Sequence, residues 1–177
     1  MVLFAASIAF ASAPVSASHT SPEGCLDTLG GYPLARFEAV HGFEFPSFVR
    51  REGEPVTKRA WTAPDEKEPG AILEHLELVY PKFSLKLERM VSTERWWIER
   101  FELRAEEMPV VCGIRPGARR EAVLSALGKR ESVGDSLSLD WSREWRERGS
   151  SFRRNATIRL SFSKFVVTRI SWEFFAD

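Results

Sequence analysis

The sequence has no excess of charge of either sign. Its 25 Lys and Arg residues balance 25 Asp and Glu residues, so the formal net charge is zero at neutral pH. Binding to a polyanion such as DNA or RNA needs a basic excess or a basic stripe. The short arginine pairs, such as Arg119-Arg120 and Arg153-Arg154, lie near glutamates, which is typical of a solvated surface. We therefore expect no nucleic-acid partner.

The sequence also lacks a hydrophobic run long enough to cross a bilayer, which takes about 20 apolar residues. The N-terminal apolar segment is shorter, and its ending, Val15-Ser16-Ala17, has the small-x-small pattern that signal peptidase cleaves. This pattern predicts a signal peptide over residues 1–17 and a periplasmic or secreted protein. One alternative is cleavage after Ala13. Another is a buried helix. A signal peptide normally begins with a positively charged residue, and no Lys or Arg precedes Arg36 in this sequence.

Cysteine is scarce, and the sequence contains two cysteines, Cys25 and Cys112. Outside the cytosol they are expected to form one disulfide. A disulfide that closes such a long loop stabilises a fold by about 2–4 kcal/mol. In a cytosolic protein the same residues would be buried thiols. A lipidated Cys25 is a third interpretation, disfavoured because a charged, proline-containing stretch precedes it. Two distant thiols without a close pair of histidines lack the spacing of zinc ligands, so we expect no metal site.

Motifs for catalysis are missing as well. The three histidines are scattered, their spacing suggests no Ser–His–Asp set, and no glycine-rich loop could hold a phosphate. Several carboxylates lie among arginines and are interpreted as ion-pair partners: Glu99, Glu102, Glu106, Glu107, Asp140 and Glu173. We expect a non-catalytic protein without a cofactor. The alternative is a small envelope hydrolase, which would need a carboxylic acid in an apolar setting.

The chain does contain an internal repeat. A helical segment that ends in glycine follows each cysteine, with Gly42 17 residues after Cys25 and Gly128 16 residues after Cys112. A polar stretch and three short runs of alternating apolar residues come after each glycine. Self-similarity on this scale indicates duplicated units. The predicted fold class is α+β, with two tandem units that each pack a short helical element on an antiparallel β-meander.

The two predicted units span residues 18–108 and 109–177. In the first, we expect a disordered segment at 18–24, a helix at 33–41, a strand at 43–48, a loop at 62–70, and strands at 75–80, 83–89 and 96–104. In the second, we expect a helix at 117–127 and strands at 136–145, 155–163 and 165–175. The alternation places Trp97, Trp141 and Trp172 in the core.

The second helical segment resembles a known signature. It begins Gly113-Ile114-Arg115-Pro116-Gly117-Ala118 and ends Val123-Leu124-Ser125-Ala126-Leu127-Gly128, and the later run Phe165–Trp172 completes the pattern. It is similar to the helix and strands of the β-lactamase inhibitory protein family and of the small outer-membrane-assembly lipoproteins of the SmpA/OmlA type. The resemblance covers residues 113–174 well and the first unit weakly. It implies a helix packed on a meander, and the tandem copy favours the inhibitor-like arrangement.

The sequence departs from both groups. The inhibitors place a disulfide within each copy, whereas this chain has one cysteine in each half, and it has no lipobox. We expect an exported protein-binding module, inhibitor- or immunity-like, that binds another protein through the solvent-facing side of its sheet. An envelope-assembly or scaffold protein is the alternative. The residues expected to contact the partner occupy outward strand positions or lack an inward place: Arg100, Glu102, Arg159, Arg169, Glu173, Trp96 and Trp145.

Overall fold

The computed structural model describes residues 21–65, 68–106, 111–128, 134–147 and 150–176 of the 177-residue chain. The predicted signal peptide lies outside these ranges. In chain order the elements are α1 (Pro22–Arg36), α2 (Phe45–Glu52), β1 (Thr57–Pro64), β2 (Ile72–Val79), β3 (Phe83–Met90), β4 (Trp97–Leu103), α3 (Arg120–Ala126), β5 (Ser136–Glu147), β6 (Ser150–Ser163) and β7 (Val166–Ala176). The predicted α+β class is confirmed. Within the described ranges, no helix has the length and apolar character that a membrane crossing requires.

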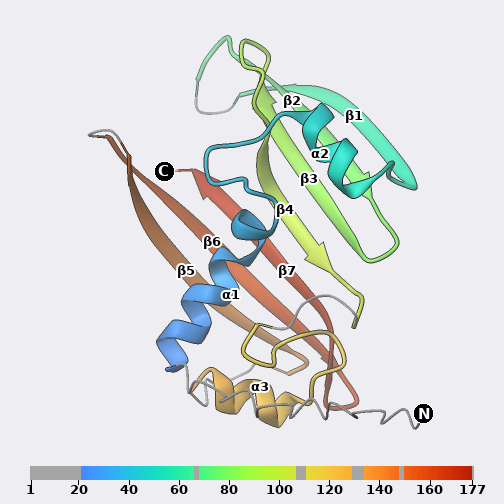
Figure 1. The fold of residues 1–177 in the computed structure, drawn as a ribbon, viewed down its shortest axis with the longest axis vertical. Helices are drawn as coiled ribbons and strands as arrows, with labels where there is room; N and C mark the ends of the chain where they lie inside the picture. The colour runs from blue at the N-terminus through green and yellow to red at the C-terminus, as the bar shows by residue number, and fades with distance from the viewer. Residues whose placement is uncertain (1–20, 66–67, 107–110, 129–133, 148–149, 177) are drawn as a thin grey trace, which may run out of the picture.

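The strands form one antiparallel sheet in the order β1-β2-β3-β4-β7-β6-β5. One meander runs from β1 to β4 and another from β5 to β7, and the pairing of β4 with β7 joins them. The helices α1 and α2 lie over one side of this sheet, with α1 across β5, β6 and β7 and α2 beside β3, and α3 lies at one end of β5, β6 and β7 (Figure 1). The sheet therefore has one face turned toward helices and one turned away from them.

The core lies between the helices and the sheet, and its centre is the junction of the two meanders. Phe101 of β4 and Trp172 of β7 are paired neighbours there, are at most 1% exposed, and have ring centroids 5.2 Å apart. Phe37, just after α1, packs edge-on against Phe101 at 5.4 Å. The indole of Trp172 donates a 2.8 Å hydrogen bond to the Leu29 carbonyl in α1. This helix thus closes the seam between the meanders.

Cys25 and Cys112 form the expected disulfide, with their Cα atoms 5.8 Å apart. Cys25 is buried in the first half of α1, and Cys112 lies in the segment that leads from β4 to α3. The covalent bond therefore ties the helix that covers the seam to the connection between the two meanders.

The first helix begins earlier than predicted. Ser21 caps it by accepting a hydrogen bond from the Gly24 amide, and Pro22 occupies the first turn, where its missing N–H costs nothing. The predicted disorder at 18–24 is therefore wrong from residue 21 onward, and the predicted start at Pro33 falls inside α1. The helix ends at Arg36, before Glu38 adopts a positive φ of 52°.

The strand predicted at 43–48 is a helix, α2. Phe45 and Phe48 are three residues apart, a spacing that fits one helical face as well as a bulged strand, and Pro46 stands at the start of the helix. Phe48 is buried against Phe37, with ring centroids 5.5 Å apart. The loop predicted at 62–70 is also partly wrong, because β1 continues to Pro64.

Candidate functional site

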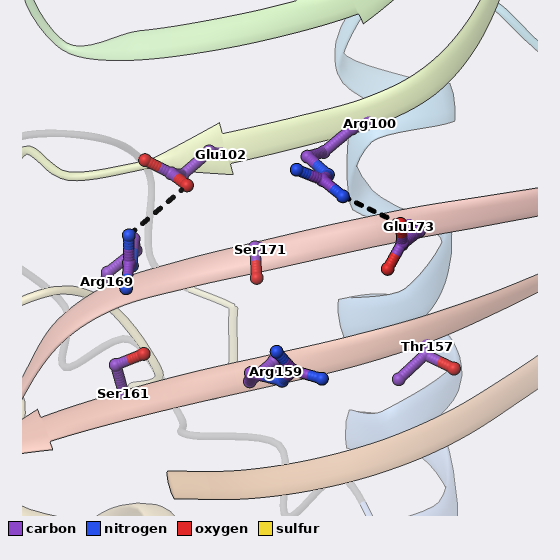
Figure 2. Close-up of a pocket in the computed structure, with 8 residues that line it drawn as sticks. All are labelled: Arg100, Glu102, Thr157, Arg159, Ser161, Arg169, Ser171 and Glu173. Atoms are coloured by element: carbon purple, nitrogen blue, oxygen red, sulfur yellow. Dashed lines mark hydrogen bonds and ion pairs between the residues drawn. The ribbon is translucent and has the colours of Figure 1, made fainter.

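The face of the sheet turned away from the helices carries a patch of polar side chains. Figure 2 shows this patch with α1 behind the strands. Side chains on a strand alternate between faces, so the neighbours of the buried core residues point outward here. We call the patch the polar face and define it by the residues that line a depression on β4, β6 and β7: Arg100, Glu102, Thr157, Arg159, Ser161, Arg169, Ser171 and Glu173.

All five charged residues expected to contact a partner lie on the polar face. The strand register explains why they converge, because it sets them in rows that run across the strands. One row runs from Arg100 through Glu173 to Thr157. The next row runs from Glu102 through Ser171 to Arg159. The predicted placement of these side chains is confirmed, and the pairing of β4 with β7 brings the two halves of the sequence together.

Two ion pairs cross the seam between the meanders. Arg100 donates a 2.7 Å hydrogen bond to Glu173, and this bond raises the pKa of the Arg100 guanidinium. Arg169 lies 3.6 Å from Glu102, which also accepts a hydrogen bond from Arg104, just after the end of β4. Both cross-strand arginines are about half exposed, so each pair contributes only about 0–1 kcal/mol to stability. Their main effect is to fix the positions of the charges around the depression.

Arg159 differs from these residues because it has no partner among the described residues. It is exposed on β6, between the two ion pairs (Figure 2). Its neighbours across the strands are Ser171 on β7 and Ser138 on β5, which offer hydroxyl groups rather than a counter-charge. A guanidinium has five N–H donors in a planar fork that matches a carboxylate. The polar face thus presents a cation whose hydrogen-bonding groups are turned to solvent.

The depression is small. It encloses about 160 Å³, whereas sites for drug-sized ligands have about 300–1,000 Å³. Hydroxyl groups of Thr157, Ser161 and Ser171 lie among the charges. The arrangement can accept a protruding polar side chain, together with a flat surface around it.

One tryptophan expected to contact a partner, Trp96, does not lie where the sequence suggested. Trp96 is 8% exposed, with the Phe45 ring 6.4 Å away on one side and the Arg89 guanidinium 4.7 Å away on another. The expectation that Trp96 is an exposed contact residue is therefore wrong, because α2, which the sequence did not reveal, covers it. The backbone of Trp145 pairs with Phe152, but its side chain lies outside the described part of the chain.

Trp97, expected in the core, is displaced from it by a β-bulge. Arg100 pairs with Lys86 and Ile98 pairs with Leu87, so Glu99 is an extra residue on β4. The extra residue reverses the alternation before it, and Ile98 takes the core position at 4% exposure. Trp97 is instead partly exposed. Trp141 and Trp172 are buried as predicted.

A second cluster of charged groups on the first meander escaped the sequence analysis. His75 on β2 and Glu88 on β3 are direct cross-strand neighbours, and Glu99 is the bulged residue of β4. Their potential ligand atoms all lie within 4.8 Å of one another. No sequence motif links these positions, because the strand register and the bulge bring them together. We call these three residues the His75 cluster.

Comparison of the chain with protein-family models, with curated proteins and with solved structures finds no match.

Proposed function

We propose that this chain is an exported, non-catalytic protein-binding module that holds its partner against the polar face. The observation that carries the proposal is Arg159, an exposed guanidinium of the polar face that has no partner among the described residues. An exposed arginine framed by fixed charges is suited to a carboxylate on a partner protein, where the pair becomes a charge-assisted, two-pronged hydrogen bond.

The shape of the polar face supports a macromolecular partner. Protein interfaces cover about 800 Å² per partner and are nearly flat, whereas small substrates are enclosed in deep, largely apolar pockets. The depression at the polar face encloses only about 160 Å³, and charges and hydroxyl groups line it. Fixed ion pairs such as Arg100–Glu173 steer an approaching partner and set its register more than they add affinity.

The sequence resemblance agrees with an inhibitor- or immunity-like role. The helix signature at residues 113–128 is similar to that of β-lactamase inhibitory proteins, and it belongs to a meander that continues into a second one, as a tandem arrangement requires. The same signature occurs in envelope-assembly lipoproteins, which keeps a scaffold role as the alternative. The disulfide suits a protein that works outside the cytosol.

The test is affinity purification of the protein from periplasm or medium, with Arg159→Glu as the disrupting variant. Arg50→Glu is the matched control, because it makes the same charge change at an exposed position on α2, which lies on the helix-covered side. We expect one abundant partner that is retained by Arg50→Glu and lost by Arg159→Glu. Loss of the same partner from both variants, or from neither, would place the binding surface elsewhere or exclude this function.

A further inference from the structure

The His75 cluster shares no residue with the polar face and has the composition of a metal site. It offers one imidazole nitrogen and two carboxylates, each from a different strand of the first meander. The closest pair is His75 Nδ1 and Glu99 Oε2, which lie 3.4 Å apart. The side chains are shielded from solvent, with 11% of His75 and 23% of Glu99 exposed. Imidazole and carboxylate groups together are typical ligands of zinc and similar divalent ions.

Two atoms of the cluster lack the hydrogen bonds that buried polar atoms normally make. His75 Nδ1 and Glu99 Oε2 are both shielded from solvent, and neither has a hydrogen-bond partner in the described part of the chain. Their 3.4 Å separation is short enough for an ion pair, but the two groups do not meet with hydrogen-bonding geometry. Buried polar atoms without partners cost free energy, and each calls for an explanation such as an ion held between them.

We propose that the His75 cluster binds one divalent transition-metal ion, zinc above all, through His75 Nδ1 and one carboxylate oxygen each from Glu88 and Glu99. Ligands about 2.0–2.1 Å from a tetrahedral zinc ion are about 3.3–3.4 Å from each other. The His75–Glu99 pair already has this spacing, as the two ends of one edge of such a tetrahedron. A change of the Glu88 side-chain torsions brings in the third ligand, and water takes the fourth position.

The groups around the cluster hold its members in ligand-like orientations. Lys86 Nζ binds Glu99 Oε1 at 2.5 Å, which leaves Oε2 turned toward His75. The ring of Trp61 stacks on the His75 imidazole, with centroids 5.2 Å apart and planes 14° from parallel. Outer contacts of this kind fix ligand orientation in metal sites.

The surroundings of the cluster disfavour the negative charge of Glu88. Burial raises the pKa of Glu88, and the neighbouring carboxylate of Glu99 raises it further, against smaller opposite effects of His75, Arg154 and Lys86. A divalent ion between the two carboxylates would replace their repulsion with attraction to a shared charge. The mixed nitrogen and oxygen ligands favour zinc over calcium or magnesium, which prefer oxygen alone.

The competing explanation is a protonated His75 that pairs with Glu99 without any metal. The test is calorimetric titration of zinc into protein freed of metal by a chelator, followed by the visible spectrum of the cobalt(II) form. We expect one ion per chain and the intense absorption of tetrahedral cobalt. Changes to groups that merely orient ligands cost about 10–100-fold in metal affinity, so His75→Ala and Glu99→Gln should each cost at least that much.

His41→Ala is the control for binding at surface histidines, because His41 belongs to the connection between α1 and α2 and is not part of the cluster. It should leave the affinity unchanged. If His75→Ala does not fold, Glu88→Gln and Glu99→Gln carry the test, since they preserve side-chain volume. The proposal is overturned by absence of zinc binding, by binding that these variants do not weaken, or by NMR showing a protonated His75 that added zinc leaves unchanged.

Discussion

The two halves of the sheet carry their outward charges in different ways. On the second meander, Arg159 is exposed and is left without a partner among the described residues. On the first meander, His75, Glu88 and Glu99 are half-buried and crowded together. An exposed charge is solvated by water, so leaving it without a partner costs little free energy. A buried charge loses this solvation and must be compensated inside the molecule. The difference suggests recognition in one half and internal ion binding in the other.

The largest effect is expected from a substitution in the core at the seam, where β4 and β7 join the two halves of the sheet. Trp172 is 1% exposed, and its indole is bonded to α1. We expect Trp172→Ala to lower the free energy of unfolding by about 3–5 kcal/mol, the usual cost of truncating a large buried aromatic side chain. Urea unfolding measures the change. Phe175→Ala, on the same strand but 47% exposed, is the control and should cost less than about 1 kcal/mol.

Removing the disulfide asks whether the halves hold together without a covalent tie. We expect Cys25→Ser with Cys112→Ser to lower the free energy of unfolding by about 2–4 kcal/mol, because the unfolded chain gains freedom when a long loop is opened. Thermal or urea unfolding of the double variant, compared with the oxidised protein, gives the value. Equal stability of the two would mean that the bond does not constrain the chain.

A smaller change sharpens the contrast between buried and exposed charge. The raised pKa of Glu88 means that the folded protein binds a proton more tightly there than the unfolded chain does. Its contribution to stability is therefore full below the ordinary glutamate pKa and is lost as the pH rises through the raised value. In metal-free protein at neutral pH, we expect Glu88→Gln to raise the free energy of unfolding by about 0.5 kcal/mol, discounted for partial exposure.

Two further measurements complete the Glu88 comparison. Between about pH 4 and neutral pH, metal-free Glu88→Gln should lose less stability than the parent, as urea unfolding at several pH values will show. Arg159→Gln, the exposed counterpart, should change the free energy of unfolding by less than about 0.5 kcal/mol at every pH. A pH dependence of the Glu88→Gln variant equal to that of the parent would contradict the buried-charge interpretation.

The sequence predicts the second meander better than the first, for physical reasons that single residues make clear. Over part of β6 and of β7, apolar residues alternate strictly with polar ones, so the alternation alone identifies the buried side, as it does for Ile158, Leu160, Ile170 and Trp172. In β4 the extra residue Glu99 interrupts the alternation, and no pattern in the neighbouring sequence predicts a bulge.

The helix α2 illustrates a different limit. Phe45 and Phe48 fit either a strand or a helical face, and the packing of Phe48 against Phe37, which lies beyond the end of α1, decides between them. Periodicity identified the outward charges of the polar face, but their meeting depends on the pairing of β4 with β7. The His75 cluster depends on register across three strands, which no short motif encodes.

The ion pair between Arg100 and Glu173 joins residues 73 positions apart in the chain, across the seam of the sheet. A nascent chain that has not yet added β7 would lack Glu173 and Arg169, and Arg159 on β6 would not be held near β4, because β7 lies between these two strands. A partner of the proposed kind would therefore meet the complete surface only after β7 has been synthesised and paired, and its binding would select fully folded chains.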